Sequence, residues 1–369
     1  MHTKGKKADR FFLVIFFLLI IIGVAMFISA SLGILAKSAS TFYSVLFSQL
    51  ILGLGAGFVG MYFALKIDYK FWRNYSFYIF LGSIFLTAAV FIPTLGWSHL
   101  GAERWLQLGP LKFQPVEILK FGFVIYFAAW LSWAKNRVQD FKFGILPFGI
   151  LLAIIAFILF NQPDTKSFIL IAVTGMCMLF ISGVSMKYIT LIGAGALIVL
   201  GSLVYFTPYL QSRIKTFIDP SGDPQGSSYQ LQQGLIAIGS GGILGRGYGQ
   251  SIQKFSYLPE PQGDSIFAVV GEELGFVGSV AIIILYLLFV LRGLRIANNS
   301  PDLFSRLLVS GIVILIVAQS FMNIASVTGV FPLTGVPLVF ISHGGTSLMI
   351  DLIAIGIVLQ ISKFNTGTR

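Results

Sequence analysis

The residues best suited to chemistry lie at the starts of two apolar runs. Glu117 and Lys120 are three residues apart, so on a helix they share one face. They could form a structural ion pair near an interface, or they could line a polar cavity in which Lys120 faces an anionic ligand. Asp264 directly precedes the other run. It could cap the helix that follows, or its carboxylate could accept a proton from a sugar hydroxyl.

Further charges and a glycine cluster surround the second of these runs. Glu272 and Glu273 lie about two turns into it, and we expect one of them to face protein and pair with a cation. The stretch 239–249 is rich in glycine, but it lacks the preceding strand and the Gly-Lys-Ser/Thr ending of a phosphate loop. Its backbone amides, beside Arg246 and Lys254, could still hold a lipid pyrophosphate.

Metal and cysteine chemistry find little support. His99 and His343 are far apart, and no spacing of His, Asp and Glu indicates a metal cage. Cys177 is the single cysteine, which excludes an internal disulfide. Asp351 lies in the middle of an apolar run, where a buried hydrogen bond to a neighbouring helix would explain it.

The composition shows whether the protein that positions these residues is soluble in water or embedded in a membrane. The 369-residue chain is 56% hydrophobic and only 11% charged, whereas an ordinary soluble domain carries about 25% charged residues. A water-soluble enzyme is therefore excluded. Apolar runs of about 20 residues recur, and this length spans the hydrocarbon core of a bilayer. We expect an all-α polytopic membrane protein whose 40 glycines let helices pack closely.

We expect a single integral membrane domain over 1–369, with about ten transmembrane helices. The basic head, 1–10, resembles the start of a signal peptide, but no cleavage motif follows, so it is expected to be a cytoplasmic tail before a retained first helix. Most of the 25 Lys and Arg residues fall in segments that an N-in, C-in topology places inside, and most acidic residues fall outside. The net charge of +11 is thus a topology signal and not the mark of a nucleic-acid partner. The expected spans are 11–35, 44–66, 75–95, 116–134, 144–160, 167–184, 187–206, 266–291, 306–328 and 343–361.

Two outer connections are longer than tethering requires. One is 96–115, and the other is a large extracytoplasmic loop, 207–265, between helices 7 and 8. Within the larger loop, 211–217 is expected to form a short helix at the membrane surface. The apolar stretch 229–239 is too short to span, so it is expected to be interfacial or re-entrant.

A series of different short motifs lies along the segments that are expected on the outer face. They are Gly101-Ala-Glu-Arg-Trp, Phe113-Gln-Pro-Val-Glu-Ile-Leu-Lys, Gln162-Pro-Asp, the run 229–251, Tyr257-Leu-Pro-Glu, the run 264–275, the run 328–338 and Ser342-His-Gly-Gly. Together they resemble the SEDS family, whose members include FtsW and RodA, and the resemblance covers nearly the whole chain. The stretches 249–259 and 327–332 are more similar to the division branch, FtsW, than to the elongation branch, RodA.

The resemblance implies a peptidoglycan glycosyltransferase. Such an enzyme polymerises lipid II, an undecaprenyl-pyrophosphate-linked disaccharide peptide, on the outer face of the bacterial cytoplasmic membrane during septal cell-wall synthesis. The implied partners are a class B penicillin-binding protein, which supplies transpeptidation and activates the polymerase, and other membrane proteins of the divisome. By motif, Asp264 matches the family's catalytic aspartate. The expected substrate-binding residues are Glu117, Lys120, Arg104, Arg213, Arg246, Lys254, Gln262 and Ser342.

The implied reaction is an inverting attack of the acceptor GlcNAc 4-hydroxyl on the anomeric carbon of the donor MurNAc, with release of undecaprenyl pyrophosphate. Asp264 would deprotonate or orient the hydroxyl, while outer-face cations would stabilise the charge that develops on the leaving group. The sequence demands no cofactor, although a divalent cation, Mg²⁺ or Mn²⁺, beside Asp264 could share that task.

Several positions depart from the family pattern. Pro261–Ser265 replaces the customary Ala-His-Thr-Asp-Phe around the aspartate. Asp164 is followed by Thr-Lys-Ser in place of Leu-Gly-Thr, which adds the cation Lys166. The segment 338–340 lacks the second proline, and His343 stands in place of a tyrosine.

Three alternative functions remain open. A lipid II flippase would use the same polar cavity, but it would not require Asp264 beside an outer sugar site. A non-catalytic division scaffold would keep the fold without turnover. A role in cell elongation, as in RodA, would use the same chemistry in a different protein complex.

Overall fold

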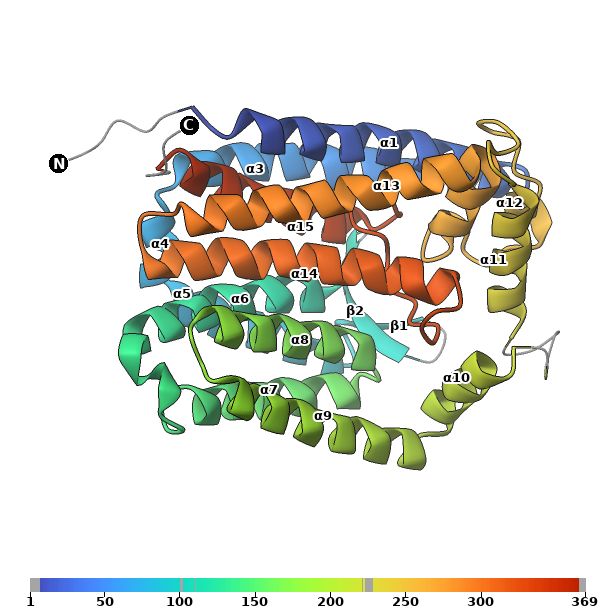
Figure 1. Cartoon of the computed structure of the whole chain (residues 1–369). Helices are drawn as coiled ribbons and strands as arrows, with labels where there is room; N and C mark the ends of the chain where they lie inside the picture. Colours follow the sequence, from blue (N-terminus) through green and yellow to red (C-terminus); the bar gives the residue numbers. More distant parts are fainter. Residues whose placement is uncertain (1–6, 100–101, 110, 221, 223–227, 365–369) are drawn as a thin grey trace.

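The computed structural model describes residues 7–99, 102–109, 111–220, 222 and 228–364. It is a bundle of long helices that run side by side across the molecule, with both chain ends at the same end of the bundle (Figure 1). The helices that coincide with the predicted spans are α1 (Arg10–Leu35), α2 (Ala39–Phe47) continued by a π-helical segment (Ser48–Gly55) and α3 (Ala56–Lys66), α5 (Ser76–Ala88) continued by a 3-10 turn (Ala89–Phe91), α6 (Pro115–Ala134), α7 (Ile145–Asn161), α8 (Thr165–Ile181), α9 (Met186–Phe206), α13 (Ile266–Asn298), α14 (Leu303–Val327) and α15 (Gly345–Ser362).

The helical membrane fold predicted from hydropathy is confirmed, since each predicted span coincides with an apolar helix. Within the described residues, seven of these helices are long and apolar enough to cross a bilayer, and three more, at 76–91, 145–161 and 165–181, are apolar but shorter. The exact number of crossings therefore stays a prediction.

Local sequence signals explain where several helices begin. Pro115 occupies the first turn of α6, where its missing amide costs nothing. Asp302 caps α14 in a capping box with Ser305, so two amides at the helix start are satisfied by side chains. The carboxylate of Asp9 accepts a hydrogen bond from the amide of Phe12 at the start of α1 and also binds Arg292 of α13 at 2.6 Å.

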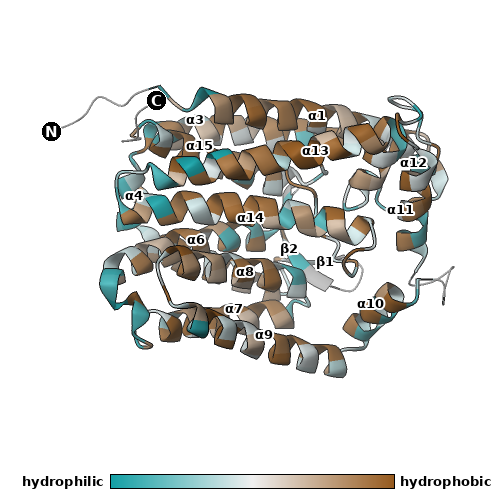
Figure 2. Ribbon diagram, viewed as in Figure 1, coloured by the Kyte–Doolittle hydropathy of each residue, from teal (hydrophilic) through white to brown (hydrophobic). Residues whose placement is uncertain are grey.

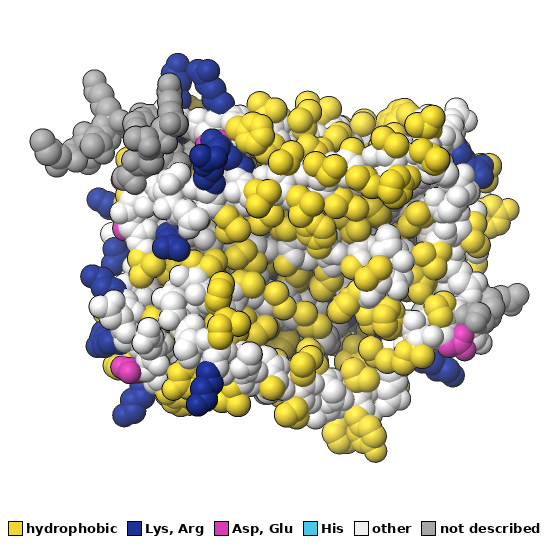
Figure 3. All heavy atoms as spheres, in the orientation of Figure 1, with side chains coloured by type: hydrophobic (Ala, Val, Ile, Leu, Met, Phe, Trp, Pro, Cys, Tyr) yellow, Lys and Arg dark blue, Asp and Glu magenta, His cyan; other side chains and the backbone are white. Residues whose placement is uncertain are grey.

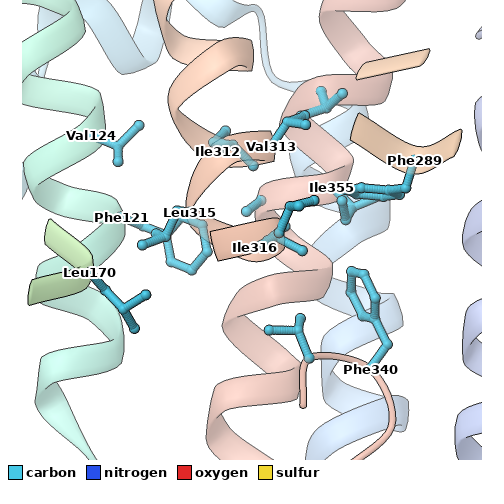
Figure 4. Packing of buried hydrophobic residues seen from close by; sticks show 14 of the residues in the cluster. Phe121, Val124, Leu170, Phe289, Ile312, Val313, Leu315, Ile316, Phe340 and Ile355 are labelled. Atoms are coloured by element: carbon cyan, nitrogen blue, oxygen red, sulfur yellow. The ribbon is translucent and has the colours of Figure 1, made fainter. Parts of the chain in front are cut away.

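The buried core lies where α6, α13, α14 and α15 meet. In Figure 2 apolar residues dominate the middle of the helices, and hydrophilic residues gather toward their ends. Glycine allows close approach at the crossing of α3 and α15, because a Cβ atom on Gly356 would lie 2.6 Å from the carbonyl oxygen of Met61. The residues labelled in Figure 4 come from α6 (Phe121, Val124), α8 (Leu170), α13 (Phe289), α14 (Ile312, Val313, Leu315, Ile316), α15 (Ile355) and the loop before α15 (Phe340).

Short elements cover the end of the bundle opposite the chain ends (Figure 1). The expected helix at 211–217 is confirmed by α10 (Pro208–Ile218), and the stretch 229–239 forms α11 (Tyr229–Ser240), which packs against α13. A further helix, α12 (Gln253–Ser256), follows the glycine cluster. The connection 96–115 contains a small antiparallel sheet that the sequence analysis did not predict, ordered β1 (Gly96–His99), β2 (Ala102–Leu108), β3 (Leu111–Phe113).

Helix α13 is interrupted near its N-terminal end by Gly275, whose φ of 66° and ψ of −164° are not helical. An interruption frees backbone groups that lipid cannot satisfy. Here the backbone of the glycine cluster satisfies them, because it pairs with α13 as one β-strand pairs with another. The hydrogen bonds are Arg246 amide to Glu272 carbonyl (2.9 Å), Gly247 to Glu273 (3.0 Å), Phe276 to Gly242 (2.9 Å) and Val277 to Ile243 (3.1 Å).

Candidate active site

A cavity of about 1630 Å³ opens among the short elements at the end of the bundle opposite the chain ends. Its walls come from the π-helical segment, β2, α6, α8 and α10, and from the loops that precede α13 and α15. Four of the predicted site residues line it together: Arg104, Glu117, Arg213 and Asp264. Five further charged or titratable residues line the same cavity: Lys112, Lys166, Tyr209, Glu260 and His343.

Asp264 stands directly before α13, but it does not cap that helix. The N-cap residue is Ser265, and no side chain closes the helix start. The Asp264 carboxylate instead accepts a hydrogen bond from Gln230 Nε2 at 3.3 Å, while its backbone carbonyl accepts one from Asn323 Nδ2 at 2.7 Å. The main chain is thereby fixed, and the carboxylate is left on the cavity wall.

Burial raises the pKa of the Asp264 carboxyl above its usual range, because the charged form loses hydration. The positive charge of Lys166, the Gln230 hydrogen bond and the charge of Arg213 oppose this rise. A carboxylate with a raised pKa is a stronger base than an exposed one, which suits proton abstraction from a hydroxyl group.

The turn at Gly335 gathers the charged groups around Asp264. Gly335 has a φ of +65°, and a Cβ atom there would lie 3.3 Å from Asp264 Oδ2, 3.9 Å from Arg213 Nη2 and 4.0 Å from Lys166 Nζ. Lys166 donates a hydrogen bond to the carbonyl of Gly335, and Arg213 donates one to the carbonyl of Leu333. Lys166 was not among the predicted site residues, although its departure from the family pattern was the available signal.

Glu117 and Lys120 form the ion pair that their spacing predicted, with 2.8 Å between Lys120 Nζ and Glu117 Oε2. Lys120 Nζ also donates to Gln319 Oε1 at 2.6 Å, and Ser347 Oγ donates to Glu117 Oε2 at 2.9 Å. Both side chains are buried, and of the two only Glu117 lines the cavity. The pair therefore joins α6, α14 and α15 beneath the cavity and presents its acidic member to it.

Arg104 lies on β2 and is held against the loop between α7 and α8. Its Nε donates to the carbonyl of Gln162 at 3.1 Å, and its Nη2 donates to the carbonyl of Pro163. Lys112 lies nearby on β3, where its Nζ is 3.5 Å from the centroid of the Trp97 ring. The small sheet thus brings two cations to the cavity wall.

Arg246 and Lys254 are outside the cavity lining. Lys254 is buried in an ion pair with Glu273 at 2.7 Å and donates to Ser29 Oγ of α1 at 3.0 Å. Arg246 is half-exposed, and its Nε lies 3.6 Å from Glu272 Oε1. We expected one of the two glutamates to pair with a cation, and both do.

The amides beside the glycine cluster bind these glutamates and not an external anion. The amides of Gly249 and Ser251 donate to the carboxylate of Glu273 at 3.0 and 3.3 Å. The amides of Ile252 and Gln253 donate to that of Glu272 at 3.0 and 3.3 Å. These four amides are therefore not free for a pyrophosphate, because the chain's own carboxylates accept their hydrogen bonds. For the rest of the cluster the hypothesis of a pyrophosphate cradle stays a prediction.

Ser342 and Gln262 connect the loop before α15 to the segment before Asp264. Ser342 Oγ donates to the carbonyl of Gly263 at 2.7 Å, and the carbonyl of Gln262 accepts the amide of His343 at 2.7 Å. Neither Ser342 nor Gln262 lines the cavity. His343 does line it and stacks on Phe27. Burial lowers the pKa of His343 to about 4, so its imidazole is neutral near pH 7.

Asp351 of α15 is buried near the Glu117–Lys120 pair. The expected hydrogen bond to a neighbouring helix stays a prediction.

These features define a class of protein, a multi-pass α-helical membrane protein with a charged cavity under a cap of short helices at one end of the bundle. The family model of the FtsW, RodA and SpoVE cell cycle proteins matches residues 9–367, so the chain belongs to this family, as the SEDS motifs predicted.

Named relatives and a solved structure agree with this assignment. The chain is 39% identical to the probable peptidoglycan glycosyltransferase FtsW of Geobacter sulfurreducens over 360 residues, which covers 97% of this chain and 96% of that protein. It is 36% identical to the stage V sporulation protein E of Bacillus subtilis over 368 residues, which covers 99% of this chain and all of that one. A solved structure described as a peptidoglycan synthase complex that coordinates polymerization and crosslinking superposes with a TM-score of 0.80, at 26% identity over 98% of this chain and 99% of that chain.

Proposed function

We propose that this protein is a peptidoglycan glycosyltransferase that polymerises lipid II on the outer face of the cytoplasmic membrane. The observation that carries the proposal is that Asp264, Arg213 and Arg104 line one cavity, with Asp264 and Arg213 on either side of the turn at Gly335. A base next to fixed cations is what transfer of a sugar from a pyrophosphate donor requires. The names of the two relatives support the same activity.

In the proposed mechanism Asp264 accepts the proton of the acceptor GlcNAc 4-hydroxyl. The oxygen then forms a bond to the anomeric carbon of the donor MurNAc as the bond from that carbon to the pyrophosphate oxygen breaks. The electron pair of the broken bond leaves with undecaprenyl pyrophosphate, and the configuration at the anomeric carbon inverts. The carbonyl of Asp264, bound by Asn323, keeps the base in position through the step.

Cations on the cavity wall would stabilise the charge that develops on the leaving pyrophosphate. Arg104 and Arg213 are available for this role, because both line the cavity. Lys120 is engaged by Glu117 and Gln319, and its role would be to hold Glu117 at the wall. Arg246 and Lys254 would act on the reaction only through the loops that they hold.

We propose that the protein acts in septal synthesis with a class B penicillin-binding protein and other divisome membrane proteins. The similarity to FtsW and to the sporulation protein supports division over elongation. The similar solved structure, which is described as a complex that coordinates polymerization and crosslinking, supports such a partner. An N-in, C-in topology would place the cavity outside, where lipid II is polymerised.

The test is polymerisation of lipid II by the purified protein with its cognate penicillin-binding partner. We expect glycan ladders from the wild type and a loss of about 10²–10⁴-fold in initial rate for Asp264→Asn, which removes the base and keeps the shape of the side chain. The wild-type rate should fall as pH drops through the Asp264 pKa. This acid limb should lie above the usual Asp range, since burial raises that pKa.

Other outcomes would favour the alternatives. Ladders of equal rate from wild type and Asp264→Asn would remove Asp264 as the base and direct attention to Glu117. Absence of ladders from the wild type, with partner bound and lipid II intact, would contradict polymerase activity. Measuring lipid II translocation in the same proteoliposomes would then separate a flippase from a scaffold.

A further inference from the structure

Lys166 is a cation that nothing in the family pattern requires. It follows Asp164 where the pattern has glycine, and it lies in the first turn of α8. The side chain reaches from α8 across the cavity wall to donate a hydrogen bond to the carbonyl of Gly335. A substitution that places a half-buried charge in a cavity has a desolvation cost, so its position needs an explanation.

The position of the Lys166 ammonium group explains why a charge is placed here. Lys166 Nζ and Asp264 Oδ2 both lie within 4.0 Å of the point where a Cβ atom of Gly335 would stand, and Arg213 Nη2 lies within the same radius. Burial raises the pKa of Asp264, and among the nearby charges that of Lys166 does most to lower it again. Among the described residues no ion pair within 4.0 Å joins Asp264 to a cation, so Lys166 and Arg213 act on the carboxylate across the turn at Gly335.

These surroundings do not fit a divalent cation beside Asp264. No group of three or more His, Cys, Asp or Glu side chains gathers anywhere in the part of the chain that the structure describes. The nearby carboxylates have other partners. Asp164 caps α8 through Ser167, Glu117 is paired with Lys120, and Glu260 accepts a hydrogen bond from Gln262 Nε2 at 3.0 Å. An ion placed at Asp264 would also be repelled by Lys166 and Arg213.

We propose that Lys166 is the resident counter-charge of Asp264, so that glycosyl transfer by this protein does not depend on a divalent cation. Lys166 is a positioning residue in this scheme. It fixes the turn at Gly335 against α8, keeps the carboxylate charged and oriented toward the acceptor hydroxyl, and occupies the place that Mg²⁺ or Mn²⁺ would take. The proposal rests on the proposed glycosyltransferase function.

The test compares initial rates of lipid II polymerisation in EDTA, in Mg²⁺ and in Mn²⁺, using the protein in complex with its penicillin-binding partner. We expect the wild type to be equally fast in all three. Lys166→Met, which keeps the length of the side chain but not its charge, should lose about tenfold or more in EDTA. Lys166→Arg keeps the charge and should restore most of the rate without making it depend on metal.

A binding measurement gives a readout that does not depend on turnover. Titration with Mn²⁺, followed by electron paramagnetic resonance, should show no site at Asp264 in the wild type. Lys166→Gly, which restores the residue of the family pattern, should gain a Mn²⁺ site that Asp264→Asn then removes. The matched control is Lys187→Met, which removes an exposed lysine at the start of α9 and should change neither rate nor binding.

Three results would overturn the proposal. One is a wild-type rate that collapses in EDTA and returns with Mg²⁺ or Mn²⁺. Another is a folded Lys166→Met variant that polymerises as fast as wild type in EDTA. The third is a wild type that makes no glycan in any of the three conditions, which would remove the glycosyltransferase function itself and this inference with it.

Discussion

At the scale of the residue, Gly335 both forms a turn that favours glycine and lies against the carboxylate of Asp264. Its φ of +65° favours glycine, and its missing Cβ atom leaves room for Asp264 Oδ2 at 3.3 Å. Gly335→Ala should therefore strain the backbone by about 1–2 kcal/mol and also displace the carboxylate. We expect a loss of roughly tenfold or more in the initial rate of lipid II polymerisation, because small misplacements of catalytic groups are costly.

Gly109 provides the matched control for this prediction. It has nearly the same φ, +63°, but no atom of the described residues would lie within 4 Å of a Cβ atom added there. Gly109→Ala should lower the thermal unfolding midpoint to a similar degree while leaving the polymerisation rate intact. Equal losses of rate in both variants would mean that backbone strain alone, and not contact with Asp264, explains the effect of Gly335→Ala.

At the scale of the element, two ion pairs hold the glycine-rich loop to α13, and they should contribute very differently. Lys254 and Glu273 are buried, and Glu273 also accepts hydrogen bonds from the loop. Lys254→Met leaves an uncompensated buried carboxylate, which costs about 3–5 kcal/mol. Arg246 is half-exposed beside Glu272, and loss of such a pair costs about 0–1 kcal/mol. The unfolding temperatures of Lys254→Met and Arg246→Met, measured in one detergent, check this order, and equal values would contradict it.

The elements that hydropathy could predict are those whose burial in lipid dominates every other term. Each long apolar run became a helix, and Pro115 marked the start of α6. The interruption at Gly275 could not be predicted, because it depends on hydrogen bonds to the distant segment 242–247. The sheet at 96–113 was missed for a similar reason, since its strands are short and pair only with each other.

The same distinction applies to the candidate site. Family motifs named Asp264, Arg104 and Arg213, and the structure places all three on one cavity. The same reasoning named Lys254, which the structure buries against Glu273. A recurring charged residue can bind substrate or hold a loop, and only the three-dimensional arrangement separates these roles.

At the scale of the whole molecule, the charges are distributed as the positive-inside rule requires. In Figure 3 most of the visible Lys and Arg side chains lie at the end of the bundle that holds both chain ends, and hydrophobic side chains cover the middle. The cavity opens toward the other end, among β2, α10 and the loop before α13. Bilayer orientation therefore decides whether the cavity can meet lipid II outside the cell.

Labelling of single cysteines tests that orientation. In a Cys177→Ala background, Gln211→Cys on exposed α10 should react with a membrane-impermeant maleimide in intact cells. Lys7→Cys and Asn136→Cys, exposed at the opposite end, should react only after the membrane is permeabilised. An even number of crossings puts both chain ends on the same side of the membrane, because each crossing reverses the side of the chain. Labelling of Lys7→Cys in intact cells would contradict an N-in topology, and with it the placement of the Asp264 cavity at the outer face.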